Sequence, residues 1–255
     1  MFLTINDHTL HVAIVGERGR PALVLLHSLG TSAALWEQQA ASLAADYFVV
    51  CPEFRGHGLS AESRTPLTCE ALAEDVLAIL SHMEISRFAL AGVSLGGVVA
   101  QIVAGQAGEN VTGLAIFDSY IASLNPQMWR DRAAKIRADG LAAIAPGVLK
   151  IWMTDADAAT ACGAGMKRML EMASDEGYAA GCDALAVADN RDVTPRITCP
   201  TIVAVGSEDN ASPVSASQAV VDAIPGAVLE VIQGAAHIPM LHHATRCSDI
   251  IRRIL

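Results

Sequence analysis

The chain is poor in aromatic and charged residues. Of its 255 residues, 3 are Trp, 3 are Tyr and 5 are Phe, and only 17% are charged, whereas 52% are hydrophobic. This balance excludes a disordered chain, a fibrous repeat and a coiled coil. Because aromatic side chains are scarce, Ala, Val, Leu and Ile must build most of the core, and the length suits one or two domains.

Basic residues are also in short supply. Lys and Arg together number 17 against 27 Asp and Glu, so the formal net charge is −10. Such a charge disfavours contact with phosphate backbones and with anionic lipid. We therefore predict a small-molecule substrate, with neither nucleic acid nor a membrane as a partner.

Signals for metal binding and for export are missing. The 6 cysteines show no C-x-x-C or other ligand spacing, and the adjacent His242 and His243 would point in different directions on a helix. We predict reduced thiols, no metal site and no cofactor. The first residues lack the basic start and long apolar stretch of a signal peptide, so we expect a cytoplasmic protein.

Charge is absent between Arg87 and Glu109, a run long enough to cross a membrane. The run contains five glycines, two glutamines and Ser94, a composition that a membrane helix does not explain. We interpret it as a buried strand, a tight turn and a helix.

Short apolar runs rich in β-branched residues recur along the chain and alternate with segments of helical periodicity. Most runs are apolar throughout, as in parallel strands that are covered on both faces. The expected strands span residues 22–26, 47–51, 88–93, 114–117, 201–205 and 228–232. Residues 2–5 and 10–14 alternate instead, which predicts an antiparallel hairpin. We predict an α/β fold with a mostly parallel twisted sheet flanked by helices.

The alternation of expected strands and helices stops between about residues 121 and 195. Only helical patterns occur there, such as those of residues 129–138, 142–152 and 158–172. We expect residues 121–195 to form a helical cap, inserted into a core made of residues 1–120 and 196–255.

A candidate nucleophile lies in the uncharged run. Gly92, Ser94 and Gly96 form a G-x-S-x-G motif between an expected strand and an expected helix. Small residues on both sides of the serine allow a strained turn that exposes the hydroxyl. This context predicts Ser94 as a catalytic nucleophile.

A nucleophilic serine needs a base and an acid that orients the base. Glu208 and Asp209 follow the strand at 201–205, and His237 follows the strand at 228–232. We predict His237 as the base. Of the two acids we favour Asp209, because a shorter side chain suits a fixed imidazole partner.

The oxyanion formed in acyl transfer needs two backbone donors. The amide of Leu95 directly follows the nucleophile, and the loop after Leu26 offers the amide of Leu29. The neighbouring Ser28 hydroxyl either contacts the substrate or caps the turn. We expect His57, in a glycine-rich loop, to shape loop packing.

In their order along the chain, these motifs resemble those of the α/β-hydrolase family. The resemblance rests on residues 27–30 with Trp36, 54–58, 92–97, 206–213 and 236–237. Within this family the chain is most similar to 3-oxoadipate enol-lactonases, through residues 28–30, 129–132 and 177–182.

The resemblance implies a substrate that keeps a free carboxylate, which an acidic protein would repel without a local cation. Arg132 is the candidate, with Arg130 second, and the alternative is an arginine of the cap that is solvated and contacts no substrate. Trp129 and Trp152 either anchor the cap on the core or contact the substrate.

The expected function is that of a serine hydrolase that cleaves a carboxylic ester or lactone through an acyl-enzyme. The best candidate is hydrolysis of 3-oxoadipate enol-lactone in aromatic catabolism. A general carboxylesterase and a carbon–carbon bond hydrolase of ring-cleavage products are the alternatives, followed by a perhydrolase or acyltransferase. A non-catalytic member would be expected to lack a triad residue, and all three are present.

Overall fold

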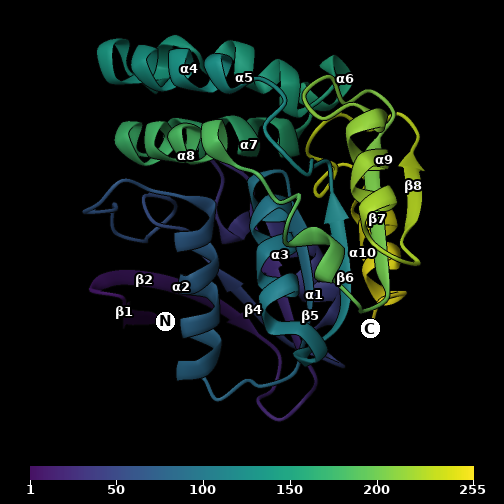
Figure 1. Ribbon diagram of the computed structural model, residues 1–255. Coiled ribbons are helices and arrows are strands. Elements are labelled where there is room, and N and C mark those ends of the chain that lie inside the picture. The colour runs from purple at the N-terminus through teal and green to yellow at the C-terminus, as the bar shows by residue number, and fades with distance from the viewer.

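A single eight-stranded sheet organises the molecule (Figure 1). The structure, a computed structural model, describes residues 1–255. Its strand order is β1-β2-β4-β3-β5-β6-β7-β8. The strands are β1 (Phe2–Ile5), β2 (His8–Val15), β3 (Ala22–Leu26), β4 (Phe48–Pro52), β5 (Phe88–Val93), β6 (Val111–Phe117), β7 (Thr201–Gly206) and β8 (Val228–Ile232). Only the β1–β2 and β2–β4 pairs are antiparallel, which confirms the predicted α/β fold.

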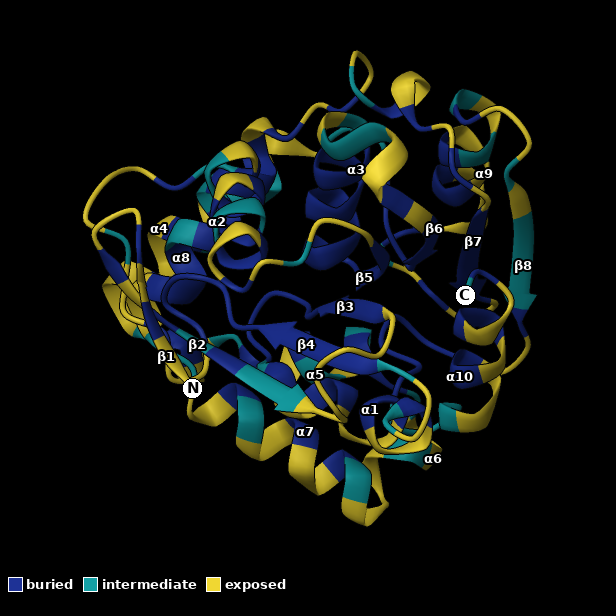
Figure 2. Ribbon diagram, turned by 90° about the horizontal axis from the view of Figure 1, so that it is seen from below, coloured by how far each residue is buried: buried dark blue, intermediate teal, exposed yellow.

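Helices cover both faces of the sheet. Those of the core are α1 (Glu37–Leu43), α2 (Cys69–His82), α3 (Leu95–Ala107), α9 (Val214–Ala223) and α10 (Ala244–Arg252). α2 packs against α3 and α3 against β5 and β6, whereas α1 packs against α10. The strands at the middle of the sheet are buried, and exposed positions concentrate on the outer faces of the helices (Figure 2). None of the helices has both the length and the apolar character that crossing a membrane requires.

The expected hairpin begins the sheet, although β2 is longer than the alternating run. Asn6 and Asp7 connect its strands with φ of 47° and 63°. A two-residue hairpin turn of this kind needs left-handed backbone at both positions, which Asn and Asp tolerate better than most residues.

Five helices separate β6 from β7 and lie together beyond one end of the sheet (Figure 1). They are α4 (Pro126–Asp139), α5 (Ala145–Trp152), α6 (Asp155–Ala158), α7 (Ala161–Glu171) and α8 (Asp175–Val187). The helical pattern at 158–172 corresponds to α7, which begins three residues later because the Thr160 side chain accepts from Gly163 N and starts α7 separately from α6.

The ends of this helical segment meet. Ser123 N donates to Ala188 O at 2.9 Å, and Asn190 N donates to Ile121 O at 2.7 Å. Since both ends leave the core at one place, the segment has the geometry of an insertion. The division into a cap (121–195) and a core remains our proposal.

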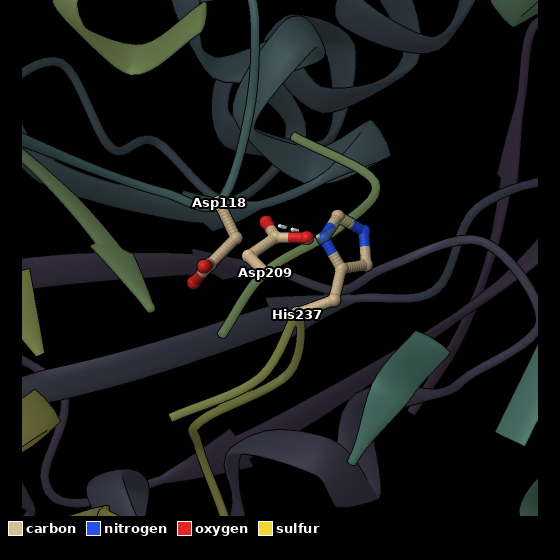
Figure 3. A group of neighbouring side chains, drawn as sticks. All are labelled: Asp118, Asp209 and His237. Carbon is tan, nitrogen blue, oxygen red and sulfur yellow. Dashed lines mark hydrogen bonds and ion pairs between the residues drawn. The ribbon is translucent and has the colours of Figure 1, made fainter. Parts of the chain in front are cut away.

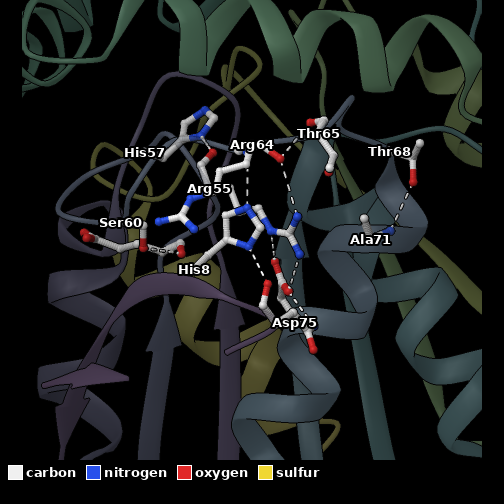
Figure 4. Close-up of polar contacts among 12 residues, drawn as sticks. His8, Arg55, His57, Ser60, Arg64, Thr65, Thr68, Ala71 and Asp75 are labelled. Atoms are coloured by element: carbon white, nitrogen blue, oxygen red, sulfur yellow. Dashed lines mark hydrogen bonds and ion pairs between the residues drawn. The ribbon is translucent and has the colours of Figure 1, made fainter. Parts of the chain in front are cut away.

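A buried ion pair fixes the loop that follows β4 (Figure 4). Arg55 donates from Nε and Nη2 to the two oxygens of Asp75 on α2, at 2.6 and 2.7 Å. Asn6 donates to the same carboxylate at 2.8 Å, so the first hairpin, the loop and α2 share one anchor.

The turn between β5 and α3 depends on close backbone packing. A Cβ atom on Gly96 would lie 2.2 Å from Leu26 O and 2.6 Å from His27 O. A Cβ on Gly92 would lie 2.2 Å from Gly96 O. Both contacts are with backbone atoms, which cannot rotate away, so only glycine fits at these positions.

We expect Gly96→Ala to destabilise the protein by about 1–3 kcal/mol or more, because overpacking forces the backbone apart. The matched control is Gly165→Ala on α7, where a Cβ meets nothing within 4 Å. The control should stabilise the protein by about 0.5–1 kcal/mol, as Gly-to-Ala changes do in helices. Urea unfolding measures both free energies, and equal effects would contradict the packing argument.

Candidate active site

Ser94 lies at the sharp turn between β5 and α3. Its backbone has φ 55° and ψ −116°, a conformation that non-glycine residues rarely adopt. Two hydrogen bonds from outside the turn hold it there: Ser94 N donates to Phe117 O, and Ser119 Oγ donates to Ser94 O, both at 2.9 Å. The turn therefore presents the hydroxyl beyond the carboxyl ends of the strands.

The structure brings together the three side chains expected to form the triad. Ser94 Oγ and His237 Nε2 are 2.9 Å apart, and His237 Nδ1 and Asp209 Oδ2 are 2.8 Å apart. A neutral imidazole that donates from Nδ1 and accepts at Nε2 satisfies both contacts. In this tautomer the imidazole can take the hydroxyl proton.

Asp209, and not the exposed Glu208, contacts the imidazole. Its second oxygen, Oδ1, accepts from Ala211 N at 2.8 Å and from Ser212 N at 3.0 Å. Burial alone would raise the pKa of Asp209, but His237 and these backbone donors outweigh it and lower the pKa below its usual value. The carboxylate is therefore charged at neutral pH.

The loop that carries His237 is held by the cap segment. His237 N donates to Ile151 O and Ile238 N to Trp152 O, at 3.4 and 3.0 Å. These carbonyls end α5, where a helix leaves acceptors without intrahelical donors. The position of the imidazole thus depends on α5 as well as on β8.

Two backbone amides belong to residues beside Ser94, since Leu95 follows it in the chain and Leu29 lines the same cavity. Leu95 is the first residue of α3, where its N–H has no intrahelical acceptor. Leu29 N donates to no acceptor in the protein. The helix N-terminus adds positive potential at the same place, so both predicted donors suit a developing oxyanion.

A pair of buried histidines supports the Leu29 loop. His27 accepts from Phe54 N at Nε2 (3.0 Å), and its ring lies 5.3 Å from that of His57. The His57 ring contacts Arg55 O through Nδ1 at 3.0 Å. Burial lowers the pKa of both imidazoles, that of His27 to about 3. Since His57 is buried and bonds to Arg55 O within its own loop, it has the packing role that the sequence predicted.

A cavity of about 290 Å³ opens at Ser94 and His237. It includes all four residues predicted to bind substrate, which are Ser28, Trp129, Arg132 and Trp152. The Ser28 carbonyl, and not its hydroxyl, accepts the turn bonds from Thr31. The hydroxyl makes no hydrogen bond within the protein and is free for a ligand.

Arg132 carries the only formal positive charge in the cavity lining, which contains no acidic residue. Its guanidinium lies 4.9 Å from the centroid of the Trp129 ring and forms no ion pair. Arg130 is exposed and does not line the cavity. Trp152 is buried in the core while it lines the cavity, so it both anchors the cap segment and faces the ligand space.

Tyr120 and Tyr178 line the cavity and were not predicted. Burial raises the pKa of both hydroxyls, so both remain neutral. The Tyr120 hydroxyl has no hydrogen-bond partner in the protein. Tyr178 lies in the stretch 177–182 that carries the family resemblance, whereas no motif marks Tyr120.

Asp118 was also missed, and it lies beside the predicted acid (Figure 3). A carboxyl oxygen of Asp118, one of Asp209 and a nitrogen of His237 lie within 4.8 Å of one another. Such a group has the composition of a metal site. Both imidazole nitrogens already contact Ser94 and Asp209, so an ion would have to break those contacts. The signal for Asp118 was a carboxylate directly after an apolar strand.

Residues 23–250 match the alpha/beta hydrolase family. The chain is 34% identical to 3-oxoadipate enol-lactonase 2 of Acinetobacter baylyi over 92% of this chain and 89% of that protein. It is 32% identical to enol-lactonase 1 of the same organism over 82% and 79% of the two chains. These similarities confirm the resemblance that the motifs indicated.

Solved structures agree with the sequence relatives. An enol-lactonase from Burkholderia xenovorans superposes with a TM-score of 0.95 at 30% identity, covering 100% of this chain and 99% of that one. A thermophilic esterase from Thermogutta terrifontis reaches 0.90 at 25% identity, covering 99% and 96%.

The buried histidines predict a loss of stability in mild acid. His27 and His57 are neutral in the folded protein and take up protons on unfolding once the pH falls below about 6.5. Because their folded-state pKa values are lowered, the stability they contribute above that pH is lost as the pH falls. His27, with its pKa near 3, should remove up to about 1.4 kcal/mol from the free energy of unfolding per pH unit below 6.5, and His57 acts in the same direction.

His57→Asn, whose amide can replace the donor to Arg55 O, tests this account. We expect urea unfolding between about pH 6.5 and 5 to show a smaller slope than in the wild type. His82→Asn, at an exposed position on α2, is the control. An unchanged slope in His57→Asn would contradict the assignment.

Proposed function

The chain belongs to the alpha/beta hydrolase family and is a hydrolase of the ester or lactone type, and on that premise we propose that Ser94, His237 and Asp209 form its catalytic triad. The observation that supports this most is the hydrogen-bond chain from Ser94 Oγ through both imidazole nitrogens to Asp209, at 2.9 and 2.8 Å. Geometry of this kind, and not sequence position, defines a triad.

The first half of the reaction forms an acyl-enzyme. Ser94 Oγ attacks the carbonyl carbon while His237 Nε2 takes the hydroxyl proton, and Asp209 stabilises the imidazolium. The amides of Leu29 and Leu95 bind the oxyanion. The intermediate then collapses, the bond to the leaving oxygen breaks, and His237 returns its proton to that oxygen.

The second half releases the acid. His237 deprotonates a water molecule, the water oxygen attacks the acyl carbon, and the proton returns to Ser94 Oγ as the ester bond breaks. An enol leaving group would tautomerise to a ketone, which makes this route effectively irreversible.

We propose 3-oxoadipate enol-lactone as the substrate. The curated relatives that act on it are 34% and 32% identical to this chain. The cavity lining adds an independent argument, because Arg132 is its only cation and it contains no acidic residue. A charge-assisted hydrogen bond from Arg132 would hold the carboxylate that remains free on such a lactone.

Three further residues of the cavity lining are proposed to contact the substrate. The free Ser28 hydroxyl would donate to a polar group of the substrate, and Trp129 and Trp152 would pack on its carbon skeleton. Residues 121–195 would act as the cap that supplies Trp129, Arg132 and Trp152 to this cavity.

We expect Ser94→Ala to lower the esterase and lactonase rate by at least about 10³-fold, since a triad without its nucleophile keeps only binding and oxyanion stabilisation. An active-site phosphonate should label the Ser94 peptide of the wild type and leave the variant unlabelled. Circular dichroism and thermal unfolding verify that the variant folds. Substantial remaining activity would refute the proposed triad.

For Arg132→Ala we expect the KM for 3-oxoadipate enol-lactone to rise by roughly tenfold or more, because a charge-assisted hydrogen bond is lost. The KM for p-nitrophenyl acetate should change little, since that ester is neutral. Arg130→Ala, which removes an exposed charge from the same helix, is the matched control.

The same assays separate the alternatives. Equal effects of Arg132→Ala on the anionic and the neutral substrate would contradict the carboxylate contact. A wild-type protein that prefers acetate or butyrate esters by orders of magnitude would be a general carboxylesterase instead of a lactonase.

A further inference from the structure

Asp118 is a fully buried carboxyl that the proposed reaction does not use. It directly follows β6, and its side chain has no access to solvent. Its φ is 46°, in the left-handed region that Asp tolerates because its side chain is short and polar. Asp118 N donates to Ala204 O at 2.8 Å, so the residue lies between the carboxyl ends of β6 and β7.

Asp118 and Asp209 differ in how many donors they receive. Asp209 accepts three hydrogen bonds, from His237 Nδ1 and from the amides of Ala211 and Ser212. Asp118 accepts one, from Gly206 N at 2.7 Å, and its Oδ2 atom has no partner in the protein. The carboxylate that accepts more hydrogen bonds keeps its charge more easily. If the pair holds one proton, that proton therefore belongs on Asp118.

Nothing nearby compensates a second negative charge. The titratable groups that face Asp118 are Asp209, His237 and the Cys247 thiol of α10, and no lysine or arginine forms an ion pair with it. Burial and the charge of Asp209 raise the pKa of Asp118 well above its usual value, whereas the pKa of Asp209 is lowered. Opposite pKa shifts keep one of two neighbouring carboxyls charged and the other neutral, so the two can have different roles.

We propose that Asp118 is a proton-bearing second acid of the site. While neutral, it acts as a positioning residue that holds the start of the Asp209 loop through Gly206 N. When Asp209 is removed, Asp118 releases its proton to water and its carboxylate becomes the partner of His237. This inference rests on the proposed triad.

The pH dependence of kcat/KM tests whether Asp118 is neutral. The acid limb reports protonation of the base in the free enzyme. If Asp118 is already neutral, Asp118→Asn should leave this limb within about 0.3 pH units of the wild type. Removal of a charged carboxylate so close to the imidazole would instead lower it by about one unit or more, which would overturn the proposal.

A double-mutant comparison tests the second role. We expect Asp209→Ala to lower kcat by about 10²-fold, less than the roughly 10⁴-fold typical of a triad without its acid. Adding Asp118→Asn to Asp209→Ala should lower kcat by a further tenfold or more, whereas Asp118→Asn alone should cost less than that. The same factor in both backgrounds, or no further loss, would overturn the proposal.

Two controls keep these results interpretable. Phosphonate labelling gives the active fraction of each preparation, and carboxyl ¹³C shifts of aspartate-labelled wild-type protein report protonation without any substitution. A protein with no neutral aspartate at pH 7 would overturn the proposal even if Asp118→Asn fails to fold.

Ser94→Ala and Asp209→Ala separate this inference from the proposed function. Activity that survives Ser94→Ala, or an Asp209→Ala protein as active as the wild type, contradicts the triad and with it the role of Asp118. If Ser94→Ala is inactive but Asp118→Asn lowers kcat by the same factor with and without Asp209→Ala, the triad stands. Only the role of Asp118 as a second acid is then contradicted.

Discussion

The left-handed backbone of Ser94 is the constraint on which the site depends. A serine at φ 55° is held there by hydrogen bonds to β6 and to Ser119, and by close packing that leaves no room for side chains at Gly92 and Gly96. Gly96 lies directly against the carbonyls of Leu26 and His27. The same contact that permits the turn therefore also sets the distance between Ser94 and the Leu29 loop, so the proposed nucleophile and the proposed oxyanion donors are positioned together.

The cavity lining is opposite in charge to the chain as a whole. The chain carries a net charge of −10, yet the cavity lining has no acidic residue and one arginine. Behind the cavity, the charge of Asp209 is stabilised by three N–H donors. An anionic ligand would thus meet an arginine and no carboxylate in the lining, an arrangement that offsets the repulsion expected of an acidic protein.

The sequence predicted the strands and the triad candidates because each has a local signature. Apolar runs mark the strands, and Gly92, Ser94 and Gly96 lie between a run and a helix. Asp118 follows an apolar strand as Asp209 does, but only the fold shows that it lies beside Asp209, because the two residues are distant in the chain. The helical pattern was placed three residues too early at its start, because a cap at Thr160 does not interrupt the apolar periodicity.

The cap segment couples substrate contacts to the base. The last turn of α5 supplies the Trp152 side chain to the cavity and the carbonyls of Ile151 and Trp152 to the loop of His237. A ligand that shifts α5 must therefore shift the imidazole relative to Ser94, and proton transfer is sensitive to such displacements. If His237 is the base, as proposed, residues of this helix influence turnover as well as binding, and substrate preference and rate are then coupled through α5.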